Sequence, residues 1–435
     1  MANSSFPKLA STPKLFSTSS QRVVWGLLGL SLFALAITGA EVYSRLAYVW
    51  AILLAGNWIW AFFSLQGINI MRRPRLRRAH LGQIYEERFE IQNLGRIPRL
   101  WLEVRDLSPL PGTRGSHVVT LIGGRQRRAY LARSRLMQRG IFSLGPTIIA
   151  SGDPFGMFPV EYQIPVEDTL LVYPLMVDVQ SFPNPPGVLT GGEALHQRTH
   201  YVTPNAAGVR EYAPGDSLNR IHWPTTVRRD RLMVKEFELD PQADIWIFVD
   251  AEKTAHASMP YSIADLSKNV FLQEQLEEIK LPPATEEYAA SIAASLGRFY
   301  LRKRRAVGLV VSGQMSTVLP PDRGGRQLGK ILEALALFRA EGRLPLSGLL
   351  EAQARHISRG STVVLITPTV REQFALTLEY LTRRGLRPIV VLMDAETFGG
   401  PPGSSYLAQM IKSVGVPVRK VENGGDIREA LVSRV

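Results

Sequence analysis

Two long apolar runs lie near the start of the chain and define its first elements. One covers residues 23–40 and the other residues 46–71, with only residues 41–45 between them. A helix needs about 20 apolar residues to cross the hydrocarbon core of a bilayer. The pattern therefore predicts a transmembrane helical hairpin over residues 21–71, after a disordered tail over residues 1–20. A cleaved signal peptide is the alternative for the first run, but a second apolar run follows it at once.

Short alternating segments follow over residues 79–180. Apolar and polar positions alternate there, and turn-forming residues separate the segments at regular intervals. Such a pattern is typical of an antiparallel β-sandwich. For residues 153–156, Asp-Pro-Phe-Gly, we expect a structural turn with Phe155 packed into the sandwich. The predicted strands cover residues 85–91, 100–104, 118–122, 129–131, 141–149 and 170–173.

Buried strands and helices alternate over residues 243–435. The first strand is an apolar run that ends at Asp250, as expected for a strand of a parallel sheet that is buried on both faces. The alternation predicts a doubly wound α/β domain with its ligand site at the carboxyl ends of the strands. Its further helices and strands are predicted at residues 286–302, 306–311, 328–340, 346–357, 362–366, 371–384, 388–393, 405–414, 416–420 and 427–432.

The connection between these two parts, residues 181–242, contains a densely charged segment, residues 209–240, which holds more candidate functional side chains than any other stretch. Charges of both signs surround aromatic residues that we interpret as apolar anchors, and residues 232–237 predict a short strand. Two interpretations stay open: a structural loop held by ion pairs, or a docking surface for a partner. The candidate binding residues are Arg210, Glu211, Tyr212, Pro214, Gly215, Asp216, Arg220, His222, Trp223, Arg228, Lys235, Phe237 and Glu238.

The same segment carries a resemblance to a known family. The motifs R-E-Y-x-P-G-D, R-I-H-W and L-x-V-K-x-F-E follow one another over residues 210–238. Upstream stand R-G-I-F-S-L-G-P at residues 139–146 and D-P-F-G at residues 153–156. With these motifs the chain resembles the domain of unknown function 58 (DUF58) family from about Arg78 onward. The resemblance implies a membrane-tethered protein with a β-sandwich, a von Willebrand factor A-like domain and a MoxR-type AAA+ ATPase as its protein partner.

The resemblance also raises the question of a metal ion. In von Willebrand A domains the strand-end edge holds Mg²⁺ through a D-x-S-x-S motif and residues of later loops, and Mg²⁺ requires octahedral oxygen ligation. Here the motif reads Asp250, Glu252 and Thr254, and the later strand ends without the expected aspartate. Asp250 and Thr254 therefore form at best a degenerate magnesium site, and we expect no other cofactor.

The charged residues indicate where the protein is located and which classes of partner it can bind. The formal net charge is +13, and the chain has no cysteine, so disulfides and thiolate metal sites are excluded. The positive-inside rule places both termini in the cytoplasm, with a multi-pass anchor in a bacterial-type inner membrane and cations beside anionic lipids. We expect no nucleic-acid partner, since no recognisable basic and aromatic motif is present. The cations that flank the predicted hairpin are Lys8, Lys14, Arg22, Arg72, Arg73, Arg75, Arg77 and Arg78.

These patterns lead to one expected function and two alternatives. The leading hypothesis is a non-enzymatic, membrane-anchored scaffold or adaptor that binds protein partners. One alternative is a hydrolase in which Glu211, Asp216 and His222 perform acid–base chemistry. The other is a Mg²⁺-dependent protein-binding module centred on Asp250.

Overall fold

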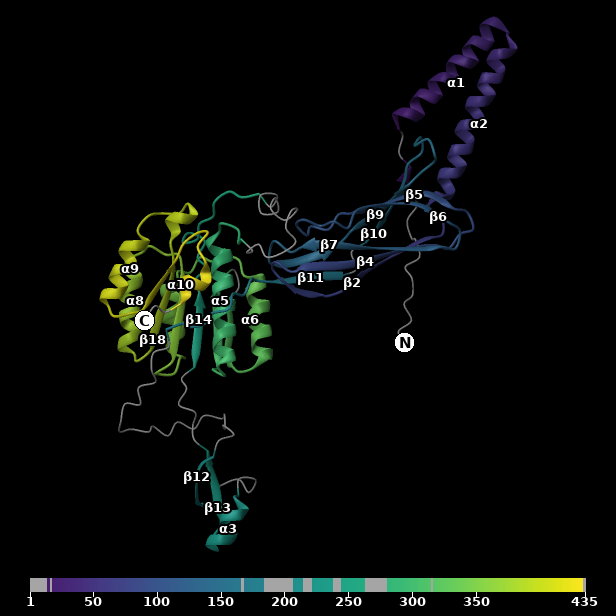
Figure 1. Ribbon diagram of the computed structural model, residues 1–435. Helices are drawn as coiled ribbons and strands as arrows, with labels where there is room; N and C mark the ends of the chain where they lie inside the picture. Colours follow the sequence, from purple (N-terminus) through teal and green to yellow (C-terminus); the bar gives the residue numbers. More distant parts are fainter. Residues whose placement is uncertain are drawn as a thin grey trace.

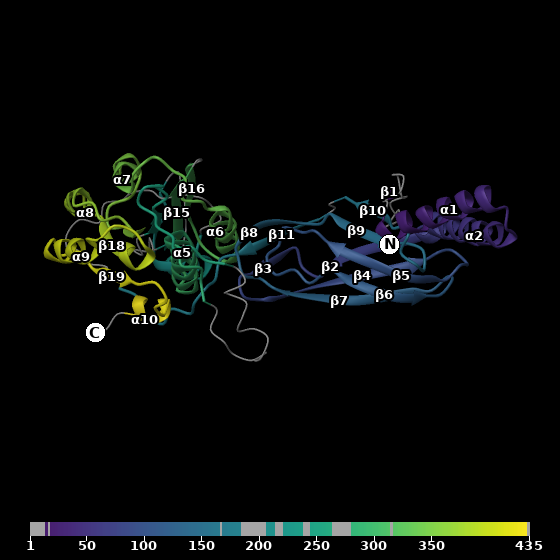
Figure 2. The same cartoon turned by 90° about the horizontal axis from the view of Figure 1, so that it is seen from above.

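The protein consists of a helical hairpin, a β region and an α/β domain (Figure 1). Seen from above, the β region lies between the helical hairpin and the α/β domain (Figure 2). This multi-domain arrangement agrees with the order of elements predicted from the sequence. The structure, a computed structural model, describes residues 14–15, 18–165, 168–183, 206–213, 221–237, 244–262, 280–313 and 316–432.

The helical hairpin is formed by α1, Ser19–Thr38, and α2, Glu41–Ser64. Both helices are long and apolar enough to cross a membrane. The side chain of Thr18 caps α1 by accepting a hydrogen bond from Gln21 N. Gly39 ends α1 with a φ of 65°, a conformation that glycine adopts without steric cost. The Thr18 cap thus defines the start of α1, and Gly39 defines its end.

The second apolar run is shared between α2 and the β region, which corrects the predicted boundary at residue 71. Helix α2 ends at Ser64, and strand β2, Ile68–Pro74, begins after a short turn at Gly67, where φ is 74°. Ile68 and Ile70 are buried in the core of the β region. An apolar run does not distinguish residues that face lipid from residues that face a protein core, so the predicted helix was too long.

The β region contains three sheets. One has the strand order β1-β10-β9-β5-β6, and the two smaller sheets have the orders β2-β4-β7 and β3-β11-β8. Side chains from β4 and β5, among them Phe89 and Leu102, share one apolar core. The strands besides β2 are β1 Lys14–Leu15, β3 Arg78–His80, β4 Ile84–Asn93, β5 Arg99–Asp106, β6 His117–Ile122, β7 Arg127–Arg135, β8 Gly140–Leu144, β9 Thr147–Ser151, β10 Val160–Ile164 and β11 Asp168–Tyr173.

Two details of the β region differ from the prediction. The single strand predicted at residues 141–149 is two strands, β8 and β9, which are separated at Gly145–Pro146. Phe155 is 65% exposed and therefore does not pack into the core. The turn is held instead by the buried carboxylate of Asp153, which accepts hydrogen bonds from Phe155 N at 3.0 Å and from Phe158 N at 2.5 Å. Phe158 is the buried aromatic residue of this turn.

The chain segments before and after the helical hairpin both enter the β region. Strand β1 precedes α1 and pairs antiparallel with β10, so that Lys14 lies opposite Glu161. Next to it, Thr18 Oγ1 donates a hydrogen bond to Met157 O at 3.0 Å. Strand β2 follows α2 directly and pairs with β4. Both ends of the hairpin are therefore attached to the same folded unit.

The α/β domain is built on a six-stranded sheet of order β16-β15-β14-β17-β18-β19. Neighbouring strands are parallel, except that β16 is antiparallel to β15. The order of helices and strands agrees with the predicted alternation. The elements are β14 Ile245–Val249, α5 Thr285–Arg302, β15 Val307–Ser312, β16 Ser316–Asp322, α6 Gly325–Leu337, α7 Leu346–Ala354, β17 Thr362–Thr367, α8 Gln373–Arg383, β18 Arg387–Met393, η3 Ala395–Phe398, α9 Ser404–Ser413, β19 Val418–Val421 and α10 Ile427–Leu431.

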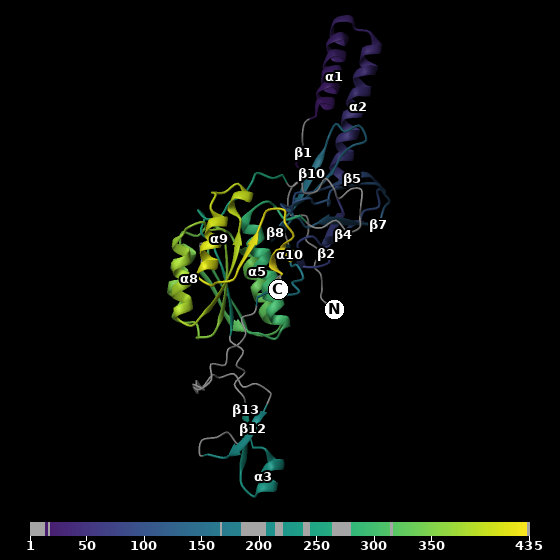
Figure 3. The same cartoon turned by 60° about the vertical axis from the view of Figure 1, so that its left-hand side comes forward.

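Helices cover both faces of this sheet (Figure 3). Ile245, Ile247 and Val249 of β14 point into the core that contains residues of α5 and α6. Phe248 of the same strand belongs to the core formed with α7, α8 and α9. Successive strand residues face opposite sides of a sheet. The strand is therefore apolar at nearly every position because both of its faces are covered.

A buried arginine joins the β region to the α/β domain. Arg139, which precedes β8, is fully buried, and its guanidinium pairs with Glu286 at 3.0 Å and with Glu287 at 2.5 Å in the first turn of α5. It also donates hydrogen bonds to Leu335 O at 3.1 Å and to Phe338 O at 2.9 Å. A buried charge must be paired in this way. The arginine of the R-G-I-F-S-L-G-P motif thus fixes the junction between two parts of the molecule.

Candidate functional site

The charged signature segment forms a small hairpin with one helix, which stands apart from the six-stranded sheet in Figure 1. Strand β12, Ala206–Glu211, pairs antiparallel with β13, Met233–Phe237, and α3, Trp223–Arg229, lies between them in sequence. Strand β13 confirms the short strand predicted at residues 232–237. Helix α3 was not predicted; Pro224 at its start has a backbone geometry suited to a first helical turn.

Ion pairs and hydrogen bonds within this hairpin are local. Arg231 pairs with Glu211 at a distance of 2.8 Å. His222 Nδ1 lies 2.7 Å from Thr225 Oγ1. These contacts join Glu211 to Arg231 and His222 to Thr225. Asp216, the third residue of the hydrolase alternative, lies outside the described residues, so that alternative stays a prediction.

The exposed residues of α3 are apolar and basic. Trp223 is 62% exposed and Val227 is 79% exposed, and Arg228 and Arg229 follow them in the last turn of the helix. We call these four residues the α3 surface. Trp223 is therefore not the apolar anchor that the sequence led us to expect, because most of its ring faces solvent. Tryptophan and arginine are enriched at protein–protein interfaces, and exposed apolar side chains often mark them.

The structure places only some of the other signature residues. Tyr212 is half-buried and follows β12, which carries Arg210. Lys235 and Phe237 lie on β13. The expectation that all these residues form one binding surface stays a prediction. Outside the described residues lie Pro214, Gly215, Asp216, Arg220 and Glu238.

A second candidate site lies at the carboxyl edge of the six-stranded sheet. The chain passes from β14 outward to β15 and later returns to β17, on the other side of β14. The strand order therefore reverses between β14 and β17, and open α/β sheets bind ligands outside the strand ends at such a point. Asp250 follows β14 and Thr367 ends β17. Both residues thus stand where this fold class places its ligands.

Asp250 is held by hydrogen bonds to both of its carboxylate oxygens. Thr367 Oγ1 donates to Asp250 Oδ2 at 2.6 Å, and Glu252 N donates to Asp250 Oδ1 at 3.0 Å. The residue is buried, and this burial raises the pKa of Asp250 above its ordinary value. Asp250 therefore ties the end of β14 to the end of β17.

Glu252 carries the second carboxylate of this edge, and Arg371 neutralises it. Arg371 Nη2 lies 2.7 Å from Glu252 Oε1, and Nη1 lies 2.9 Å from Oε2, which makes a bidentate pair. Thr254 Oγ1 donates to Glu252 Oε1 at 2.6 Å and accepts a hydrogen bond from Arg371 Nη2 at 3.2 Å. After β17, Thr369 Oγ1 accepts a hydrogen bond from Arg371 N at 3.3 Å. This local turn positions the arginine toward Glu252.

His256 connects the edge to the first turn of α5. Its Nε2 lies 2.9 Å from Asp250 O, and its Nδ1 lies 2.9 Å from Thr285 Oγ1. Since a carbonyl oxygen only accepts, Nε2 is the donor. Burial lowers the pKa of His256, which keeps the imidazole neutral at pH 7. The histidine is thus a structural link between the strand end and the helix.

Arg371 and His256 were missed as members of this site when only the sequence was considered. The available signal was a cation soon after a buried strand, in Thr367-Pro368-Thr369-Val370-Arg371. A neighbouring strand end shows the same arrangement, because Asp394 after β18 pairs with Lys420 at 2.7 Å. The hydrogen bond to Asp394 raises the pKa of Lys420. Glu252 and Asp394 at this edge are therefore each paired with a cation of the chain itself.

The predicted metal residues, Asp250 and Thr254, do lie at one edge, but their geometry does not fit a divalent ion. Mg²⁺ needs oxygen ligands that converge on one point. Here both oxygens of Asp250 accept hydrogen bonds, and Thr254 contacts Glu252 and Arg371. Among the residues that the structure describes, no group of three or more His, Cys, Asp or Glu side chains could hold a metal ion.

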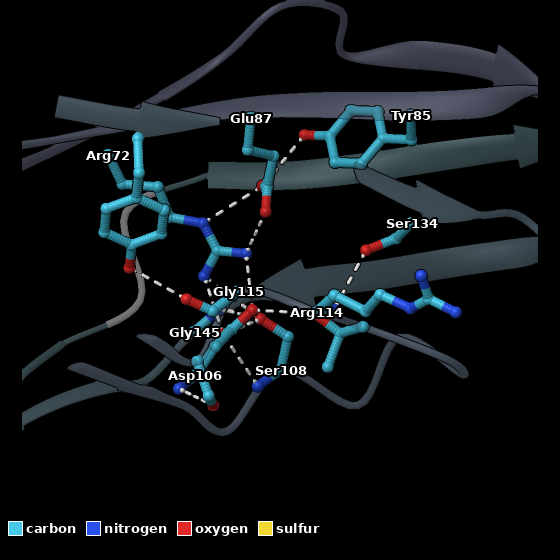
Figure 4. A network of polar contacts seen from close by, with 12 residues as sticks. Arg72, Tyr85, Glu87, Asp106, Ser108, Arg114, Gly115, Ser134 and Gly145 are labelled. Carbon is cyan, nitrogen blue, oxygen red and sulfur yellow. Dashed lines mark hydrogen bonds and ion pairs between the residues drawn. The ribbon is translucent and has the colours of Figure 1, made fainter. Parts of the chain in front are cut away.

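A separate polar network lies inside the β region (Figure 4). Arg72 of β2 forms a bidentate pair with Glu87 of β4, with Nη2–Oε2 and Nε–Oε1 distances of 2.7 and 3.0 Å. The same guanidinium donates to Asp106 of β5, with an Nη1–Oδ1 distance of 3.0 Å. Tyr85 donates to Glu87 at 3.1 Å, and Ser108 donates to Asp106 at 2.5 Å. The network joins two of the three sheets.

This network changes the role expected for one of the arginines that follow the helical hairpin, Arg72. Arg72 points into the protein instead of toward lipid headgroups. Burial opposes the charged form, but the pairing with Glu87 and Asp106 outweighs it and raises the pKa of Arg72. Three of the next arginines also bind carboxylates of the protein, in the pairs Arg75–Glu86, Arg77–Asp168 and Arg78–Glu333.

Comparison with known proteins gives a family and one curated relative. The model of the family described as "Protein of unknown function DUF58" matches residues 208–274. The "Uncharacterized protein YeaD" of Bacillus subtilis (strain 168) is 23% identical over 350 residues, which is 74% of this chain and 78% of that protein. Neither description states an activity.

Similarity to solved structures is weak. The CARDB domain of the PF1109 protein from Pyrococcus furiosus is 13% identical, with a TM-score of 0.17 over 24% of this chain and 91% of that chain. The alkylpurine DNA glycosylase AlkC of Pseudomonas fluorescens is 12% identical, with a TM-score of 0.18 over 33% of this chain and 42% of that chain. These scores are too low to carry an argument about fold or function. The family match and the curated relative, in contrast, support the resemblance to the DUF58 family that the motifs indicate.

Proposed function

We propose that this protein is a non-enzymatic, membrane-anchored cytoplasmic scaffold or adaptor that binds a partner protein through the α3 surface. The observation that carries the proposal is the exposure of Trp223 and Val227 beside Arg228 and Arg229. Burying such apolar side chains in a complex contributes roughly 1.5–3 kcal/mol for each large residue. The neighbouring guanidiniums favour a partner with acidic groups around an apolar pocket.

The anchor in this proposal is the pair α1 and α2, inserted as a multi-pass hairpin in the cell membrane. Attachment of β1 and β2 to the same β region supports an even number of crossings, because both ends of the hairpin must then lie on one side. The cations that flank the hairpin favour the cytoplasmic side. The β region and the α/β domain would accordingly face the cytoplasm.

We extend the proposal to the fold types of the two large parts. The opposed sheets that share the core around Phe89 and Leu102 support a β-sandwich. The order β16-β15-β14-β17-β18-β19, with one antiparallel edge strand, supports a von Willebrand factor A-like domain. From the family resemblance we further propose a MoxR-type AAA+ ATPase as the partner, with the adaptor acting in the assembly of a complex.

Capture from the native membrane tests this function. The full-length protein, solubilised in detergent, would be isolated with and without ATP and its partners identified by mass spectrometry. Nucleotide-dependent recovery of an AAA+ ATPase that is lost in Trp223→Ala supports the proposal. Recovery that does not depend on Trp223, or recovery of the protein alone, would contradict it. Trp101→Ala is not a suitable control because that ring packs in the β region, whereas Tyr406→Ala removes an aromatic ring that is exposed elsewhere, on α9.

A further inference from the structure

The carboxyl edge between β14 and β17 holds two carboxylates at a point where a cation would be expected. Asp250 and Glu252 lie two residues apart, and the side chain of Glu252 is largely buried. An unpaired carboxylate in such a place is costly because it loses its hydration. The edge therefore needs a positive charge, from a metal ion or from the protein.

Arg371 meets this need with a guanidinium. Two N–H groups bind the two oxygens of Glu252, and a third donates to Thr254 Oγ1. An arginine side chain stays protonated at all physiological pH values, so the positive charge is permanent. The backbone N–H of Arg371 donates a hydrogen bond to Thr369 Oγ1, so the local turn fixes the position from which the side chain extends. At the same time it is 49% exposed, at the mouth of the edge.

We propose that Arg371 is the resident cation of this edge and that it replaces a divalent ion. The guanidinium neutralises Glu252, occupies the hydroxyl of Thr254 and leaves the oxygens of Asp250 to the strand junction. The edge is then closed and complete without a metal. A corollary is that removing the guanidinium frees the oxygens of Glu252 and Thr254, which Arg371 otherwise occupies, so that they become available to Mg²⁺.

Thermal unfolding of the full-length protein in detergent, with Mg²⁺ alone as the probe, tests the assignment. The wild type is expected to keep the same Tm in millimolar Mg²⁺ and in EDTA. Arg371→Ala is expected to lower Tm by roughly 2–4 °C, the shift that corresponds to loss of a partly exposed pair. Mg²⁺ should restore most of that shift, since an ion that binds only the folded state stabilises it.

Two further variants make the result decisive. Arg371→Lys keeps the charge and should not respond to Mg²⁺. Arg383→Ala removes an exposed arginine of α8 that pairs with Glu379, and it should behave as the wild type. A saturable rise of the wild-type Tm in Mg²⁺ that Asp250→Ala abolishes would overturn the proposal. So would an Arg371→Ala protein that folds and ignores Mg²⁺. If Arg371→Ala does not fold, the dependence of Tm on Mg²⁺ in the wild type and in Arg371→Lys still tests whether the edge binds a metal ion.

Discussion

At the scale of single residues, buried charges decide most of the specific packing. Arg139 is fully buried between the β region and α5, with Glu286 and Glu287 as its ionic partners. Burial raises the pKa of Glu287, against the attraction of Arg139. Arg139 is therefore the partner that offsets the cost of burying the Glu287 carboxylate.

Removing that guanidinium should be severely destabilising. Arg139→Ala leaves the buried carboxylate of Glu287 and two main-chain carbonyls without Arg139 as their donor, and breaking one partner of a buried pair costs about 3–5 kcal/mol. Chemical denaturation of the full-length protein measures the loss. Arg339→Ala is the matched control, because Arg339 also pairs with Glu286 at 3.1 Å but is half exposed. Equal losses in the two variants would contradict the role of Arg139.

Asp250 gives a prediction that depends on pH. Its pKa is raised in the folded state by burial, so the charged form lowers stability above the folded pKa, and the penalty vanishes below the ordinary aspartate value of 3.8. Asp250→Asn keeps an acceptor for Glu252 N and should raise Tm at pH 7. The gain should shrink as the pH falls toward 4. A Tm difference that grows on acidification would show that the charged carboxylate stabilises the fold.

At the scale of elements, strand β2 is secured by the network of Figure 4. Arg72 connects β2 to Glu87 on β4 and to Asp106 on β5, in a different sheet. The same network encloses Gly115, where an added Cβ would clash with the carboxylate of Asp106. The first strand after the helical hairpin is thus bound to two sheets of the β region.

Arg72→Ala is expected to weaken this lock strongly, whereas Arg73→Ala is not. Loss of Arg72 leaves two buried carboxylates facing each other, with an expected cost of about 3–5 kcal/mol. Arg73, its neighbour in β2, is exposed. Limited proteolysis of the solubilised protein reports on opening of the β region, and faster cleavage is expected for Arg72→Ala alone. Similar cleavage of both variants would contradict the claim that the Arg72 network holds β2 in the β region.

Elements with a clear hydrophobic period could be predicted, and elements defined by long-range partners could not. The buried strands of the α/β domain were predicted within a residue or two because their apolar runs are continuous. Strand β16 was missed because it contains Pro320 and Pro321, which an edge strand tolerates. Strand β1 has two residues and exists only by pairing with β10. Helix α3 is too short for a period to be recognised.

The site at the carboxyl edge of the six-stranded sheet was predicted only in part, because some of its residues are close in sequence and others are brought there by long-range strand pairing. Asp250, Glu252 and Thr254 are adjacent in sequence to a recognisable strand end. Arg371 reaches them from more than 100 residues away in the chain, through the pairing of β14 with β17. Phe155 was expected inside and lies outside because the Asp153 hydrogen bonds, which periodicity does not reveal, set the turn. Arg139 likewise has no local signal of burial.

At the scale of the whole molecule, the pairing of β1 with β10 makes a prediction about membrane topology. Since the chain has no cysteine, a single cysteine can be introduced at Ala40, between α1 and α2, or at Ser413, which is exposed at the end of α9. An impermeant maleimide added outside the inner membrane should label Ala40→Cys but not Ser413→Cys. Both should react after the membrane is permeabilised. Labelling of Ser413→Cys from outside would reverse the proposed orientation.

The central claim concerns the α3 surface, and affinity for the captured partner tests it most directly. The double variant Arg228→Glu/Arg229→Glu would be compared with the wild type in a direct binding assay. Arg383→Glu/Arg384→Glu is the matched control, because it also reverses two consecutive arginines at the end of a helix, α8.

The expected result is a loss of affinity of at least about tenfold for the α3 variant, which corresponds to roughly 1.4 kcal/mol. The loss should diminish as salt is added, because it arises from exposed charges. The control variant should bind as the wild type does. Unchanged binding of the α3 variant, or an equal loss in both variants, would contradict the account of this protein as an adaptor that docks its partner on α3.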